Sequence, residues 1–190
     1  MSSKVILASS SPRRRELLEK AEIKYSLCIK NIDETIPEGY TPEQAVEYLA
    51  ESKAEAVAKI NEEAIVIGAD TVVVLDGEIL GKPKDTDDAI QMLLRLSDRE
   101  HQVITGVSLV QGKNRKTFHV SSKVKFYEIS YSEALRYVKT GEPMDKAGAY
   151  GIQGKGCVFV ERIEGDYYNI VGLPIARLAK ELKKMQGEGE

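Results

Sequence analysis

A run of hydroxyl and basic side chains lies near the start of the chain. Residues 9–15 read Ser-Ser-Ser-Pro-Arg-Arg-Arg and follow a short apolar segment, so a strand should end and a helix should begin there. Backbone N–H groups at a helix N-terminus, together with hydroxyl and guanidinium donors, suit a phosphate chain. The segment therefore predicts an anion site, although it lacks the glycines of a P-loop. The alternative is a serine cap and a basic first turn that face only solvent.

A single carboxylate interrupts the most apolar stretch of the chain. Asp70 lies within residues 65–75, which are otherwise rich in Val and Ile. An ionised carboxylate in such surroundings is costly unless a cation, hydrogen bonds or a metal stabilise it. Gly68 and Ala69 are small enough to leave room beside it for a substrate or an ion. Asp70 is the sharpest candidate for chemistry, and the alternative is a carboxylate that only caps a strand end.

Three more charged residues are candidates by position. Lys82 lies in a loop stiffened by proline, which suits an ammonium presented to phosphate oxygens. Glu34 follows an expected strand end and could share a divalent cation with Asp70. Lys53 lies on an expected helix among small residues. Their residue types alone do not distinguish Glu34 and Lys53 from ordinary surface charges.

A glycine-dense segment spans residues 145–156 and carries Gln153. Glycine allows the backbone to fold closely over a ligand, and the Gln153 amide offers both a donor and an acceptor to the edge of a base. A flexible connection is the equal alternative.

The composition bounds the class of protein. With 190 residues, 42% of them hydrophobic and 30% charged, the chain suits a globular α/β domain. A net charge of −3 argues against general attraction to nucleic acid or membranes, and no apolar run reaches spanning length. The N-terminus lacks a secretory signal pattern, which indicates a cytoplasmic protein. Cys28 and Cys157 are expected to be core thiols, and His101 and His119 to be strand histidines.

The expected elements alternate between helices and strands, with two hairpins among them. Capping boxes at residues 41–44 and 130–133 open two of the helices. Asp76-Gly77 is typical of a two-residue hairpin turn. Helices are expected at 12–20, 41–61, 87–96, 130–141 and from 174, and strands at 4–8, 25–29, 65–75, 78–80, 103–110, 117–127 and 157–163. Because hairpins interrupt a strict βαβ alternation, we expect an elongated, twisted and mixed β-sheet with flanking helices.

Four segments in this order resemble the Maf family of nucleotide pyrophosphatases. They are ILASSSPRRRELL at 6–18, IGADTVVVLDGEILGKP at 67–83, DKAGAYGIQGKG at 145–156 and VGLP at 171–174. The resemblance implies hydrolysis of nucleoside triphosphates to the monophosphate and pyrophosphate with a divalent cation, Mg²⁺ or Mn²⁺. It also implies one domain over residues 1–190, with two lobes around a central cleft, similar to inosine triphosphate pyrophosphatases.

The resemblance also carries roles for individual residues. It makes Asp70 the proton acceptor or a metal ligand, with Glu34 as the acidic residue near the metal. The phosphate-binding residues that it implies are Ser9, Arg14, Lys53 and Lys82. It makes Arg13, Thr71 and Gln153 determinants of substrate choice, in the combination of the branch that prefers dTTP and UTP.

The function implied is a house-cleaning enzyme for dTTP and UTP, modified pyrimidine triphosphates included. The alternative is a nucleotide-binding regulator of septum formation that turns nothing over. The expected partner is a nucleoside triphosphate, with neither a nucleic acid polymer nor a membrane, and the expected assemblies include a homodimer.

Changing Gln153→Glu tests the predicted role of this side chain in base recognition. We expect dTTP and UTP to become poorer substrates relative to purine triphosphates, because a carboxylate replaces the amide donor. The kcat/KM for each nucleotide measures this ranking. An unchanged ranking would place base recognition elsewhere.

Overall fold

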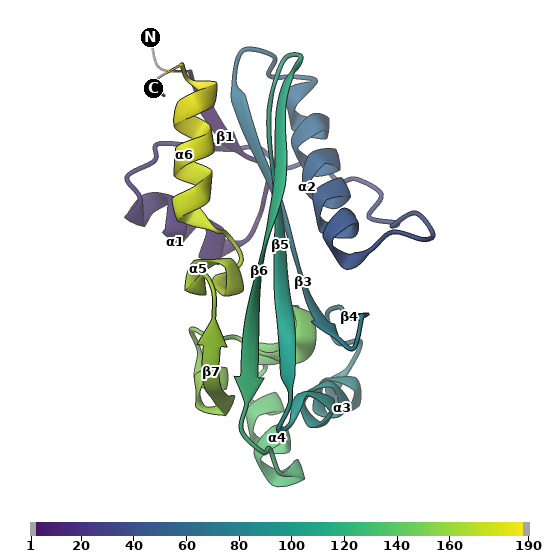
Figure 1. Ribbon diagram of the computed structural model, residues 1–190. Coiled ribbons are helices and arrows are strands. Elements are labelled where there is room, and N and C mark those ends of the chain that lie inside the picture. Colours follow the sequence, from purple (N-terminus) through teal and green to yellow (C-terminus); the bar gives the residue numbers. More distant parts are fainter. Residues whose placement is uncertain (1–2, 188–190) are drawn as a thin grey trace. The chain divides into compact units, whose positions relative to one another are not determined.

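The computed structural model describes residues 3–187, which form two compact units (Figure 1). Within the described residues, unit 1 comprises residues 3–70, 105–120 and 172–187. Unit 2 comprises residues 71–104 and 121–171. The central cleft expected from the resemblance stays a prediction.

A seven-stranded mixed sheet confirms the expected fold class. Its strand order is β2-β1-β3-β5-β6-β7, and β4 pairs with β3. Strand β1 is parallel to β2 and β3, whereas the β3–β4 and β6–β7 pairs are antiparallel. The strands are β1 (Val5–Leu7), β2 (Ser26–Leu27), β3 (Ile65–Leu75), β4 (Glu78–Leu80), β5 (Glu100–Gln111), β6 (Asn114–Phe126) and β7 (Val160–Glu164).

The helices agree with the sequence prediction to within a few residues at most ends. They are α1 (Pro12–Lys20), α2 (Pro42–Ala58), α3 (Thr86–Leu96), α4 (Tyr131–Val138), α5 (Tyr167–Val171) and α6 (Ile175–Met185). Both predicted capping boxes form, at Thr41 for α2 and at Ser130 for α4. Helix α5 was not expected, because five residues are too few to show a helical period.

The sequence prediction was wrong about the start of one strand and about the burial of one cysteine. The segment 157–163 does not begin as a strand, because residues Lys155–Phe159 form the 3₁₀ turn η3 and β7 starts only at Val160. Cys157 lies in that turn and is exposed, whereas Cys28 is half-buried against the apolar cluster that includes Ile6. His101 and His119 do lie on strands, β5 and β6.

Close contact between α2 and the sheet defines unit 1. A Cβ atom placed on Gly68 of β3 would overlap the carbonyl oxygen of Ala50 and lie 2.8 Å from the backbone nitrogen of Ala54. A Cβ atom placed on Gly106 of β5 would likewise overlap the backbone of Val46 in α2. The room expected beside Gly68 is therefore taken by helix α2, not left for a ligand. Helices α1 and α6 lie on the other side of these strands (Figure 1).

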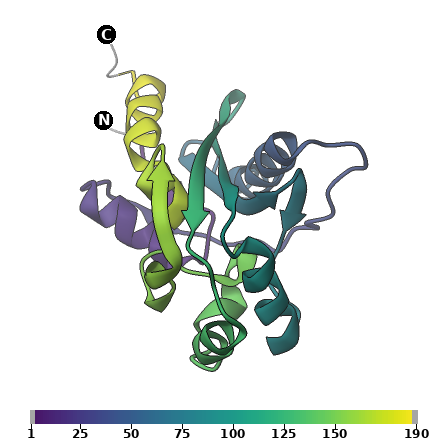
Figure 2. The ribbon, with the colours of Figure 1, turned by 60° about the horizontal axis from the view of Figure 1, so that its bottom comes forward.

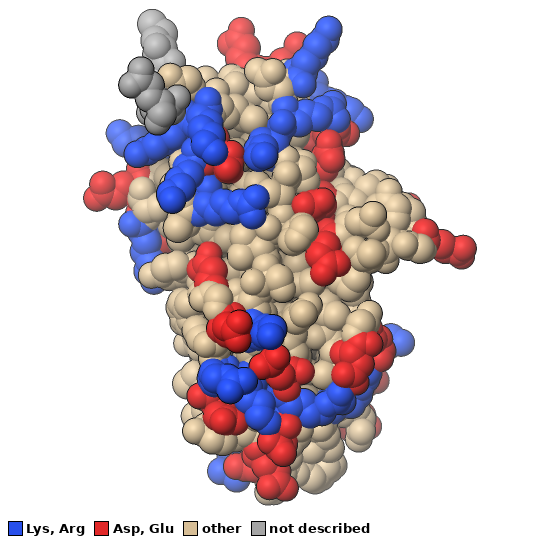
Figure 3. Space-filling view, in the orientation of Figure 1, with Lys and Arg blue, Asp and Glu red and all other residues tan. Residues whose placement is uncertain are grey.

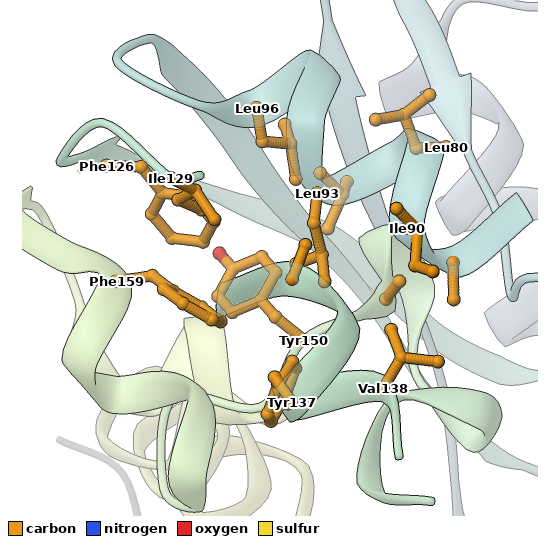
Figure 4. Close-up of a cluster of buried hydrophobic side chains, with 14 of the residues drawn as sticks. Leu80, Ile90, Leu93, Leu96, Phe126, Ile129, Tyr137, Val138, Tyr150 and Phe159 are labelled. Atoms are coloured by element: carbon orange, nitrogen blue, oxygen red, sulfur yellow. The ribbon is translucent and has the colours of Figure 1, made fainter. Parts of the chain in front are cut away.

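Unit 2 has its own apolar core, to which α3 and α4 contribute side chains (Figure 4), and Figure 2 shows these two helices side by side. Phe126 and Tyr150 meet edge to face with ring centroids 4.7 Å apart, and Tyr137 meets Phe159 at 5.2 Å. His101 is buried among these rings, where its Nε2 atom lies 2.8 Å from the Tyr150 hydroxyl. Burial lowers the pKa of His101 to about 4, so this histidine is neutral and structural near pH 7.

The surface carries charges of both signs. Figure 3 shows Lys and Arg gathered over α6 and acidic side chains interspersed elsewhere on that face. Within residues 3–187 no helix is long and apolar enough to cross a membrane.

Changing Gly68→Ala tests the contact between α2 and β3. We expect a loss of roughly 1–3 kcal/mol in the free energy of unfolding, because the added methyl group must displace helix backbone. Urea unfolding measures the loss. Gly81→Ala is the matched control, because open space surrounds Gly81. Equal stability of the two variants would contradict the close contact.

Candidate functional site

Arg14 joins three segments that are far apart in the sequence. It extends from the first turn of α1, and its Nη1 atom donates to the Ser9 hydroxyl at 2.9 Å and to the Ala69 carbonyl at 3.0 Å. Its Nε atom donates to the carbonyl of Gly172 at 2.9 Å. Arg14 therefore connects the predicted anion segment to the interior of β3 beside Asp70 and to the chain before α6.

Gly172 is a site residue for which the sequence indicated no role. Its φ of 121° is a backbone conformation that residues with a side chain rarely adopt. In this conformation the Gly172 carbonyl points toward Arg14. The available signal was its place in the VGLP segment, where a glycine closely precedes a proline. A backbone acceptor of this kind has no recognisable side chain, so residue types alone could not reveal it.

Lys53 provides the cation that the apolar setting of Asp70 requires. Its Nζ atom lies 2.6 Å from Asp70 Oδ1 and 2.9 Å from Glu34 Oε1. The Lys53 and Asp70 side chains are each 17% exposed, whereas Glu34 is 60% exposed. Lys53 precedes Ala54, and the backbone of Ala54 packs against Gly68. The close contact of α2 with β3 therefore places the Lys53 ammonium group beside the Asp70 carboxylate. Lys53 is thus no ordinary surface charge.

Charge also links the basic segment to these carboxylates. Burial lowers the pKa of Arg14, while Asp70 acts in the opposite direction. Arg13 adds to the lowering, and Glu34 opposes it more weakly. These groups therefore lie within electrostatic reach of one another, and their opposite charges offset one another in part.

The structure brings five predicted residues of unit 1 together, and they are called the charged cluster below: Ser9, Arg14, Glu34, Lys53 and Asp70. Arg13 is half-buried on α1, next to Arg14. Thr71, Lys82 and Gln153 belong to unit 2, where Thr71 is half-buried on β3 and the other two are exposed. The roles of these four residues stay predictions.

The donor set of the charged cluster fits a divalent cation that arrives with phosphate. Glu34 and Asp70 both contact the Lys53 ammonium group, so these two carboxylates are the candidate protein ligands of such a metal. Mg²⁺ commonly takes one or two carboxylates and completes its shell with water and phosphate oxygens. No group of three or more His, Cys, Asp or Glu side chains that could hold a metal ion occurs within residues 3–187.

The fold and the charged cluster define an α/β protein in which basic and acidic side chains gather at one place in unit 1. The model of the Maf-like protein family matches residues 4–185, and the chain belongs to this family.

Curated relatives match almost the full length of the chain. A protein of Geobacillus sp. (strain WCH70) named dTTP/UTP pyrophosphatase is 51% identical over 181 residues, which cover 95% of this chain and 97% of that protein. A protein of Clostridioides difficile (strain 630) with the same name is 55% identical over 182 residues, covering 95% of this chain and 94% of the other.

The solved structure of a HAM1 protein from Coxiella burnetii has the same fold. It matches with a TM-score of 0.53 and 15% identity, covering 96% of this chain and 99% of that one.

The Lys53–Asp70 pair can be tested by its coupling. Lys53→Met should lower the free energy of unfolding by roughly 1–3 kcal/mol, because it leaves a poorly solvated carboxylate without its cation. Adding Asp70→Asn should recover part of that loss, which urea unfolding of the single and double variants measures. Strictly additive losses would show that the two side chains do not stabilise each other.

Proposed function

We propose that this protein hydrolyses dTTP and UTP, and related pyrimidine triphosphates, to the monophosphate and pyrophosphate. The observation that carries the proposal is the charged cluster, in which Lys53 pairs with Asp70 and Arg14 donates to the neighbouring Ala69 carbonyl. The names of relatives about half identical over nearly the whole chain support the same activity. Removal of surplus or non-standard pyrimidine nucleotides is the role that this activity would serve.

The charged cluster contains groups of the kinds that are needed when water attacks the α-phosphate. Asp70 is the acceptor for a proton of the attacking water or a ligand of the metal that binds this water, and both roles use its ionised carboxylate. Lys53 holds the Asp70 carboxylate at 2.6 Å and so fixes its position on β3. In-line attack on a phosphoryl group depends on such positioning and on neutralising phosphate charge.

Glu34 and Asp70 would hold the divalent cation, Mg²⁺ or Mn²⁺. When bound, it would neutralise phosphate charge and make a bound water more acidic. Ser9, Arg14, Lys53 and Lys82 are proposed to contact the triphosphate. Because Arg14 also holds Ala69 and Gly172, its guanidinium gives the Ser9 loop a defined place before substrate arrives.

The selection of the base is assigned to Arg13, Thr71 and Gln153. Gln153 is exposed and its amide can both donate to and accept from a pyrimidine edge. The expected homodimer stays a prediction, and none of these roles requires a second copy of the chain.

The product distinguishes the proposed reaction from other nucleotide hydrolysis. The purified protein is incubated with Mg²⁺ and each of dTTP, UTP, CTP, GTP and ATP, and the products are separated by ion-exchange chromatography. We expect monophosphate and pyrophosphate, fastest from dTTP and UTP. Diphosphate with orthophosphate would mean attack at the terminal phosphate and would contradict the proposal. Tight nucleotide binding by calorimetry without any product would support the non-catalytic regulator.

Asp70→Asn completes this test, because it keeps the size of the side chain and removes the base. Turnover should fall by roughly 100-fold or more if Asp70 is the general base. Asp76→Asn is the matched control, since Asp76 pairs with Arg99 in unit 2 and has no assigned role in the reaction. Full activity of Asp70→Asn would overturn the assignment.

A further inference from the structure

The loop that carries Gln153 is anchored on both sides of that residue. On one side, the backbone N–H of Gly151 donates to the Tyr137 hydroxyl at 3.0 Å. On the other side, the N–H groups of Lys155 and Gly156 donate to the two carboxylate oxygens of Glu142, at 2.9 and 3.3 Å. Residues 151–156 are called the recognition loop below.

The two anchors are joined to each other. The Tyr137 hydroxyl donates to Glu142 Oε1 at 2.9 Å while it accepts from Gly151, so one continuous chain of hydrogen bonds runs beneath the recognition loop. Burial raises the pKa of Tyr137, so its hydroxyl keeps its proton and remains a donor. Burial alone would raise the pKa of Glu142, but hydrogen bonds from Lys155, Tyr137 and Gly156 outweigh it and lower that pKa. Glu142 therefore remains a carboxylate that accepts all three.

The glycines of this segment allow the close approach to the anchors. A Cβ atom on Gly154 would overlap the Glu142 carboxylate, and one on Gly156 would lie 2.8 Å from the Tyr137 hydroxyl oxygen. One on Gly151 would lie 2.8 Å from the side chain of Lys146, whose Nζ atom donates to the Glu142 carbonyl at 2.6 Å. The density of glycine therefore reflects tight packing on the anchors, which favours the closely folded loop over the flexible connection.

The anchors themselves rest on the core of unit 2. Tyr137 is 5% exposed, lies on α4 and packs its ring against Phe159 (Figure 4). Glu142 begins the 3₁₀ turn η1 (Glu142–Asp145), shortly after the end of α4. A rigid core is thus connected through two side chains to a loop whose Gln153 side chain is exposed.

We propose that Glu142 and Tyr137 are positioning residues for substrate selection, which hold the recognition loop so that Gln153 presents its amide in one orientation to a pyrimidine base. This inference rests on the proposed function, in which Gln153 reads the base. Neither residue touches substrate, and each acts through the backbone of the loop.

The kinetic signature follows from where Gln153 acts. A hydrogen bond to the base contributes equally to the ground and transition states, because the reaction occurs at the α-phosphate. Loosening the loop should therefore raise KM for dTTP and UTP and leave kcat nearly unchanged. A merely structural defect would instead reduce the active fraction, which lowers kcat for every nucleotide by the same factor.

The experiment compares Glu142→Gln and Tyr137→Phe with wild type, using dTTP, UTP and ATP. Glutamine keeps the size of Glu142 but has only one acceptor oxygen, and phenylalanine keeps the buried ring of Tyr137. We expect the ratio of kcat/KM for dTTP to that for ATP to fall by roughly 3- to 10-fold in each variant, as expected for one weakened hydrogen bond. In a Gln153→Ala background the same changes should lower the ratio no further.

Two matched controls remove similar groups elsewhere in unit 2. Ser97→Ala deletes a hydroxyl that accepts from the backbone of Ile129, and Glu133→Gln deletes a carboxylate that accepts from the backbone of Ser130. Both should retain the wild-type ratio. Hydrogen exchange gives a second readout that needs no substrate. The amides of Lys155 and Gly156 should exchange faster in Glu142→Gln, and that of Gly151 in Tyr137→Phe.

The outcomes separate this inference from the proposed function. If wild type prefers dTTP and both variants keep the ratio, the positioning roles are overturned and the function stands. An unchanged exchange rate in the variants, or an equal fall of the ratio in the controls, would also overturn the positioning roles. If wild type releases no pyrophosphate from any nucleotide, the proposed function is overturned, together with the assignment of Gln153 to base recognition.

Discussion

The burial of one negative charge organises unit 1. Asp70 lies on a strand whose other residues, apart from Thr71, carry no polar side chain, and its own side chain is only 17% exposed. The free energy needed to remove a carboxylate from water must be offset by a nearby cation, and Lys53 provides it at 2.6 Å. The ammonium reaches this place because α2 lies directly against Gly68 of β3. Because Gly68 has no side chain, α2 comes close enough for Lys53 to pair with Asp70, two residues further along the strand.

Arg14 has the corresponding role for the basic segment. Three adjacent arginines at the start of a helix oppose the helix dipole and repel one another, so local sequence alone does not favour them there. Tertiary partners change this balance for Arg14, because its guanidinium donates to one hydroxyl and two backbone carbonyls. The carbonyl of Gly172 takes part only because its backbone adopts a φ of 121°. The phosphate-binding geometry proposed for Ser9 therefore depends on a glycine near the start of the last helix.

One physical role of glycine, the close approach of another segment, occurs in both units. In unit 1, Gly68 and Gly106 admit the backbone of α2. In unit 2, Gly154 and Gly156 admit Glu142 and Tyr137 beneath the loop that carries Gln153. From sequence alone, such glycines suggest open space or flexibility, and at Gly68 that interpretation was wrong. What fills the space beside a glycine comes from another part of the chain.

The sequence by itself determined most helices and strands, the mixed character of the sheet, the family and the need of Asp70 for a partner. Apolar period, capping boxes and turn residues are local signals, and family motifs persist as short segments, so both can be read along the chain. Tertiary structure decided that the partner is Lys53, that Gly172 holds Arg14 and that Glu142 anchors Lys155. It also made residues 155–159 a 3₁₀ turn with Cys157 exposed, where the sequence indicated a strand. These features depend on contacts between residues from 13 to 158 positions apart, and no local pattern records such contacts because folding alone brings the partners together.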